Sequence, residues 1–134
     1  MSYLIDADIT DKVALAFAVD IVNDYFDEVD GEINDLAAKL GIDTDDIDTD
    51  FQGTGRIAYK IRRFGIAYCL YRFFEDRAGV NDVDFPETEK YYMKSRHYYD
   101  KQKSLRSEIT AELFVDDVED GGDRAIGTSR IYRG

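Results

Sequence analysis

Two side chains in this sequence could carry out chemistry, and neither has the neighbours that chemistry requires. His97 is the sole histidine. On a helix, the residues one turn away from it would be Met93, Lys94, Asp100 and Lys101. A general base needs an orienting partner and a substrate within reach, so we interpret His97 as a surface residue. Cys69 lies in an apolar stretch without a nearby histidine, and free cysteines of this kind are commonly buried. We therefore predict no catalytic residue.

An acidic segment at residues 43–50 raises the question of a calcium site. Setting Asp48 as position 1 of an EF-hand loop places Gly53 at position 6, as that motif requires. Position 12 is then Tyr59, where the motif needs a bidentate Glu. We interpret the segment as a solvated loop and leave weak cation binding open.

The remaining binding motifs are weak or missing. No Walker-type, G-x-G-x-x-G or G-x-S-x-G pattern occurs, and Gly-Thr-Gly at 53–55 is a weak anion-site signal by itself. Two tyrosine pairs, at 91–92 and 98–99, could stack on nucleic-acid bases. The net charge of −12 opposes that, so we expect these tyrosines to pack against a helix or a partner. The sequence predicts no cofactor and no metal site.

Composition limits the class of protein further. The chain has 134 residues, 44% of them hydrophobic, which is enough for one folded domain. Acidic residues outnumber basic ones 29 to 17, which favours solubility and argues against a nucleic-acid-binding surface. Asp outnumbers Glu 21 to 8, a bias that a high-ionic-strength source would also favour.

Redox and targeting signals point to a soluble protein without disulfides. One cysteine cannot build a disulfide framework. The N-terminus is neither basic nor followed by an apolar segment, so we expect no signal peptide. Uninterrupted apolar runs such as residues 66–71 are far shorter than the ~20 residues that a bilayer span needs. We expect no membrane association.

Apolar periodicity predicts a mainly α protein, a small bundle of about four helices with an extended C-terminal tail. The predicted helices span residues 10–28, 32–40, 55–77 and 86–114. The predicted start and stop signals are Asp8 or Thr10, Gly41, Gly79, and Pro86 with the Asp84–Glu87 capping box. Only ~8 residues join the last two helices, so we expect them to pack antiparallel.

The last residues differ in character from the rest. We divide the chain into a helical domain, 1–118, and a flexible tail, 119–134, used for partner contact. The tail contains two adjacent glycines and alternating basic and apolar residues, which could order by strand addition to a partner. The predicted partner-binding residues are Arg124, Ile126, Arg130, Ile131, Tyr132 and Arg133.

Three segments together resemble the small helical head–tail connector (adaptor) proteins of tailed phages and related archaeal viruses. The first is an early helix at 14–25, in which small residues lead into a tyrosine. The second is the helix at 56–71, with its Ile-Ala-Tyr-Cys-Leu-Tyr ending. The third is a long helix in which tyrosines at 91, 92, 98 and 99 precede Leu105 and Ile109. The resemblance covers residues 10–115.

The resemblance implies a structural protein of the virion, assembled in the host cytoplasm. It implies a ring of about 12 copies between the portal protein and the neck or tail proteins, through which DNA passes without specific binding. An alternative from another class is an acidic DNA mimic, or a small regulator, that binds a basic partner protein. A mimic would form a compact dimer or a one-to-one complex, whereas an adaptor would stay monomeric alone and form a ring on a portal.

Overall fold

Four α-helices and four single turns of 3-10 helix form the described structure. The computed structural model describes residues 2–79 and 85–115. The helices are α1 (Lys12–Leu15), α2 (Ala18–Lys39), α3 (Tyr59–Ala78) and α4 (Phe85–Glu108). The 3-10 turns are Asp6–Asp8, Thr44–Asp46, Phe51–Gly53 and Ala111–Leu113. No strand occurs within the described ranges, and the predicted mainly α bundle is confirmed.

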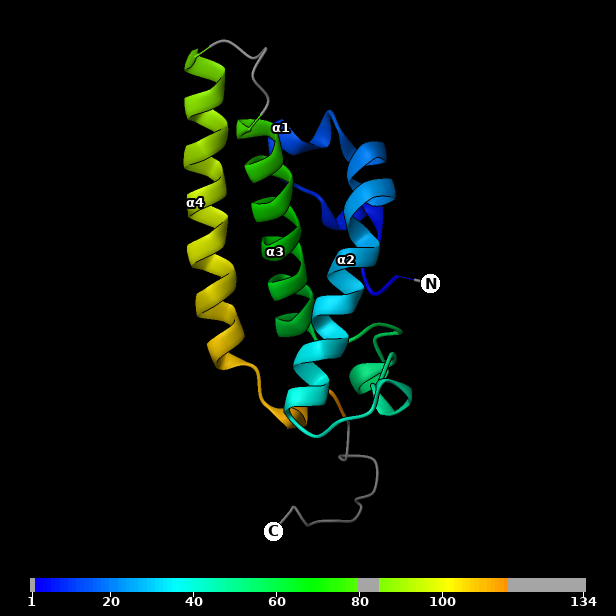
Figure 1. The fold of residues 1–134 in the computed structure, drawn as a ribbon. Helices are drawn as coiled ribbons and strands as arrows, with labels where there is room; N and C mark the ends of the chain where they lie inside the picture. Colours follow the sequence, from blue (N-terminus) through cyan, green and yellow to red (C-terminus); the bar gives the residue numbers. More distant parts are fainter. Residues whose placement is uncertain (1, 80–84, 116–134) are drawn as a thin grey trace.

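Helix α3 lies at the centre, with α2 on one side and α4 on the other (Figure 1). Helices α3 and α4 run antiparallel and side by side, as predicted from their short connection. None of the described helices has the length and apolarity that a bilayer span requires.

The apolar circumference of α3 is explained by this central position. Its buried residues include Phe64 and Phe74, both 0% exposed. Gly65 lets α2 approach closely, because a Cβ built at this position would lie 3.2 Å from side-chain atoms of both Val29 and Ile33. The core is therefore continuous from α2 through α3.

Helix α4 covers the opposite side of α3 with a partly polar face. The residues of this face recur at alternating spacings of four and three: Tyr91, Ser95, Tyr98, Gln102, Leu105 and Ile109. The ring of Phe74 stacks against Tyr91 and Tyr98, with centroids 6.0 Å apart in each case. Packing of the tyrosines against the third helix is thus observed for Tyr91 and Tyr98, whereas Tyr92 is 57% exposed.

The predicted break between the first two helices is wrong, because α2 continues through Asp30 and Gly31. Val29 and Ile33, on either side, are 0% exposed and keep facing the core. Their burial outweighs the helix cost of one glycine, about 1 kcal/mol. The predicted stop at Gly41 agrees with the structure, since α2 ends at Lys39 and Gly41 has φ +86°.

The break occurs earlier instead, at Phe17, which separates α1 from α2. Phe17 leaves helical geometry (φ −117°, ψ 19°), and its ring contacts Phe73 at 5.4 Å between centroids. Asp11 caps α1, in place of the predicted Asp8 or Thr10. Asp8 forms an ion pair with Arg56 instead.

The boundaries of the last two helices also need correction. Helix α3 begins at Tyr59 and not near residue 55, because Gln52, Gly53 and Gly55 adopt positive φ. It ends at Ala78 with Gly79 as its C-cap, as predicted. Helix α4 ends at Glu108, six residues before the predicted end, and the chain turns so that Phe114 (0% exposed) joins the core. Asp84, half of the predicted capping box, lies outside the described residues.

The Asp11 carboxylate joins α1 to α4. One oxygen accepts hydrogen bonds from the backbone N–H groups of Val13 and Ala14, at 2.9 and 3.0 Å. The other accepts from the Tyr98 hydroxyl at 2.6 Å and from Lys94 Nζ at 2.9 Å. Burial alone would raise the pKa of Asp11, but these hydrogen bonds hold its pKa below the ordinary value.

Replacing Gly31 by Ala should raise the free energy of unfolding by about 0.5–1 kcal/mol. Gly31 is exposed within α2, and nothing lies within 4 Å of the Cβ that the substitution adds. Gly65→Leu is the matched contrast and should lower the free energy of unfolding by about 1–3 kcal/mol through overpacking against Val29 and Ile33. Chemical denaturation of both variants measures this, and a destabilised Gly31→Ala would show that α2 is interrupted there.

Asp11→Asn should lower the free energy of unfolding by about 1–3 kcal/mol, because Asn keeps the cap but loses the charge that Lys94 and Tyr98 contact. The pKa of Asp11 is lower in the folded state than in the unfolded state, so the stabilisation by Asp11 decreases as the pH falls. The stabilisation is complete above the unfolded pKa of about 3.9 and disappears as pH falls through the lower folded value. Thermal melts from pH 7 to pH 2 should therefore show the two proteins converging in acid. Asp24→Asn, at an exposed position, is the control, and a constant difference across the range would contradict the assignment.

Candidate functional site

The two side chains considered for catalysis are a surface histidine, His97, and a buried cysteine, Cys69. His97 is exposed on α4 and meets only the edge of Tyr98, with ring centroids 4.9 Å apart. Cys69 is 0% exposed, and burial raises the pKa of its thiol to about 12, so the thiol stays protonated at neutral pH. Among the described residues, no three His, Cys, Asp or Glu side chains gather to hold a metal ion.

The acidic segment at 43–50 forms a loop with one 3-10 turn, in agreement with the loop interpretation. Asp48 accepts a hydrogen bond from the backbone N–H of Asp50, and Asp50 accepts one from the N–H of Gly55 at 2.6 Å. The backbone N–H of Asp48 donates to the carbonyl of Phe114 at 2.7 Å, which ties the loop to the segment after α4. These aspartates therefore have a structural use in shaping the loop.

A stripe of aromatic and basic residues runs along α4 beside the face that packs on α3. Its members are Tyr92, Arg96, Tyr99, Lys103 and Arg106, at spacings of four, three, four and three. This α4 stripe is accessible, since Tyr92 is 57% exposed and Arg96 and Lys103 are also exposed. The guanidinium of Arg96 lies 5.7 Å from the Tyr99 ring centroid, over its face. The spacing of these residues is visible in the sequence, but it does not by itself show which of them are exposed.

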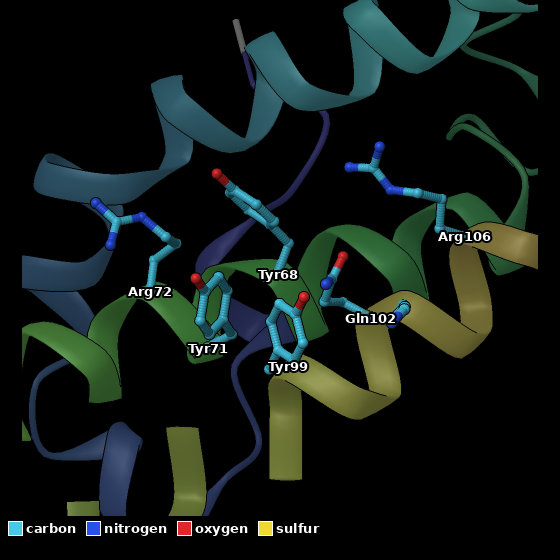
Figure 2. Close-up of a pocket in the computed structure, with 7 residues that line it drawn as sticks. Tyr68, Tyr71, Arg72, Tyr99, Gln102 and Arg106 are labelled. Carbon is cyan, nitrogen blue, oxygen red and sulfur yellow. The ribbon is translucent and has the colours of Figure 1, made fainter. Parts of the chain in front are cut away.

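Part of the stripe borders a hollow of about 450 Å³ between α3 and α4 (Figure 2). Tyr68, Tyr71 and Arg72 line it from α3, and Tyr99, Gln102, Lys103 and Arg106 line it from α4. The Tyr71 and Tyr99 rings meet edge to face, with centroids 5.1 Å apart. The hollow thus has aromatic walls and a basic rim.

One polar atom at this hollow has no partner. Gln102 is 7% exposed, and its Oε1 makes no hydrogen bond within the described structure. A buried carbonyl oxygen without a donor costs about 1–3 kcal/mol. The Gln102 side chain points between Tyr68 and Arg106 (Figure 2), and its Oε1 has less than 1 Å² of exposed surface.

Two glutamates of α2 bind the residues on the α2 side of the hollow. Glu28 accepts hydrogen bonds from the Tyr68 hydroxyl at 2.8 Å and from Arg72 Nε at 2.7 Å. Arg106 donates to Glu32 at 2.9 Å. Burial and the bond to Glu28 raise the pKa of Tyr68, which keeps it a donor. Lys103 is exposed and has no ion pair with any residue in the described part of the chain.

A second surface is apolar and lies at the start of the chain. Ile5, Leu15 and Val19 are 50%, 51% and 73% exposed. They border two adjoining hollows of about 400 and 500 Å³, which share Asp6 and Ala18. We call this the N-terminal apolar surface. Exposed apolar side chains grouped around hollows are typical of protein-binding sites.

Charge is divided unevenly along the chain. Residues 1–55 carry 15 acidic and 2 basic side chains, whereas residues 56–106 carry 12 basic and 7 acidic ones. Some of these charges pair inside the domain, as Arg72 does with Glu28. Four exposed aspartates of α2 have no ion-pair partner among the described residues: Asp20, Asp24, Asp27 and Asp35.

The partner-binding residues predicted from the sequence, Arg124 to Arg133, lie outside the described residues, as does the predicted domain boundary at 118. They remain predictions. The two surfaces found here are on α1, α2 and α4 instead.

Replacing Gln102 by Met should leave the free energy of unfolding unchanged or raise it by about 1 kcal/mol. The substitution removes the unpartnered buried oxygen and keeps the length of the side chain. Chemical denaturation checks this, with Leu105→Ala as a control that should lose about 2–5 kcal/mol by opening a cavity in the same helix face. A loss above about 1 kcal/mol for Gln102→Met would mean that this oxygen is hydrogen-bonded in solution.

Comparisons with known proteins gave no match from which a function could be assigned. No protein-family model matches the chain, and neither the curated proteins nor the solved structures give a significant match. The likeness to head–tail connector proteins therefore rests on the residue patterns alone, and function has to be argued from geometry and charge.

Proposed function

We propose that this chain is a structural protein of a virus particle, a head–tail connector subunit that forms a ring between the portal protein and the neck. Its role is assembly and not catalysis. The observation that carries the proposal is the N-terminal apolar surface, where Ile5, Leu15 and Val19 are at least half exposed beside two hollows. Binding another protein requires an exposed apolar surface of this kind, whereas catalysis on small molecules does not.

The apolar surface suits a different protein better than a second copy of this chain. If two copies joined through the same patch, the contact would be two-fold symmetric and would close at a dimer. A ring needs two different faces for its lateral contacts. We therefore assign the apolar surface to the portal protein, with Asp6 at its border meeting a basic group of that partner.

Charge fits the same role. A net charge of −12 lets DNA pass along a channel without adhering to it. The tail residues Arg124 to Arg133 have the opposite sign and provide a further contact with the portal or with a neighbouring copy.

The row of unpaired aspartates on α2 favours one alternative, a DNA mimic. Regularly spaced carboxylates on one helix face could occupy the phosphate-binding site of a basic protein. That role predicts a one-to-one complex that excludes DNA, whereas a connector gives a ring on the portal. Size measurement of the complex separates the two.

Val19→Asp should weaken binding to the purified portal protein of the same virus by at least about tenfold, since it places a charge in the centre of an apolar contact. The substitution lies in the first turn of α2, where an acid is tolerated, so the fold should be kept. Ala38→Asp, exposed near the other end of α2, is the matched control and should bind like the unmodified protein. Equal binding by the two variants would refute the proposed portal contact.

A further inference from the structure

Two helix faces in this protein have matching spacing and opposite charge. The α4 stripe follows a four-three-four-three spacing and carries two exposed cations, Arg96 and Lys103, while its third, Arg106, is paired with Glu32. On α2, Asp20, Asp24, Asp27 and Asp35 lie on one face at spacings of four, three and eight. Gly31 lies on the same face, in the interval before Asp35. We call this the α2 stripe. Residues spaced by three and four form one helix face, so each stripe can lie along another helix.

The α4 stripe has the character of a protein contact. Tyrosine and arginine are the residues most enriched among those that dominate binding energy. The hollow beside Tyr99 has room for side chains, and Tyr92, Arg96 and Lys103 are exposed beside it or in line with it on α4.

The α2 stripe has the complementary character. Its four aspartates are exposed and have no ion pair with any described residue. Gly31 is an exposed glycine with open space around it, where the backbone of another helix could approach closely. The internal pairs of this domain already join α2 acids to α3 and α4 cations, as Arg106 joins Glu32 at 2.9 Å. The same chemistry can continue between copies.

We propose that neighbouring copies of this chain associate head to tail, with the α4 stripe of one copy lying on the α2 stripe of the next. Because the two stripes belong to different helices flanking α3, the contact is heterologous, and repeated contacts of this kind build a ring when the rotation closes (Figure 1). The inference rests on the proposed function for its ring, but it concerns the lateral contact alone and not the portal.

A charge exchange tests the contact. The acid-face variant is Asp24→Lys with Asp27→Lys, and the basic-face variant is Arg96→Glu with Lys103→Glu; all four positions are exposed. Each variant alone should self-associate at least about tenfold more weakly than the unmodified protein at about 50 mM salt. An equimolar mixture of the two should recover association, because every contact in it again joins opposite charges. Sedimentation velocity at protein concentrations up to about 1 mM measures this.

Matched controls carry the same change in net charge away from both stripes. They are Asp45→Lys with Asp46→Lys for the acid face, and Lys12→Glu with Lys101→Glu for the basic face. Both controls should associate like the unmodified protein.

An adaptor is expected to be monomeric when it is dilute and alone. The head-to-tail contact is therefore overturned by an unmodified protein that stays monomeric even at about 1 mM, or by a mixture that fails to recover association. Either result leaves the proposed portal contact, which the Val19→Asp variant tests, unaffected. Conversely, recovery in the mixture together with unchanged portal binding by Val19→Asp would support the lateral contact and reject the proposed function.

Discussion

The Asp11 carboxylate fixes the relative position of the first and last helices of the domain. It caps α1 through two backbone N–H groups and accepts from Tyr98 and Lys94, residues far away in sequence on α4. A buried carboxylate is costly unless its oxygens are satisfied, so its four donors have to stay in place together. Tyr98, held in this way, stacks on Phe74 and so positions α4 against α3.

The packing of α4 on α3 divides the tyrosines of α4 into those that face α3 and those on the adjacent face. Inward residues at 91, 95, 98, 102, 105 and 109 form a partly polar face, in which Ser95 donates to the carbonyl of Tyr71 at 3.4 Å. The adjacent face then holds Tyr92 and Tyr99 together with basic residues, and it stays accessible. A helix with polar groups on both faces shows little amphipathicity, so the packing of α4 depends on a few buried residues such as Tyr91 and Leu105.

The candidate surfaces were only partly predictable from the sequence. Exposure of His97 and burial of Cys69 followed from helix position and local polarity, and the structure confirms both. The α4 stripe has a spacing that can be read directly, but its exposure depends on which side of α4 faces α3. The apolar surface had no sequence signal, because Val19 belongs to the same apolar pattern as buried residues such as Ile21. The tail residues from Arg124 onward remain untested predictions.

The sequence by itself determined the helical class, the ends of α2 and α3 near glycines, and the antiparallel pairing of α3 with α4, since these depend on local periodicity, backbone freedom and a short connection. Tertiary structure decided the rest. Whether Gly31 interrupts a helix depends on the burial of Val29 and Ile33 against α3, and the interruption at Phe17 depends on its contact with Phe73. The early end of α4 depends on the site that receives Phe114. In each case local preferences differ by about 1 kcal/mol or less, so contacts between residues distant in sequence settle the outcome.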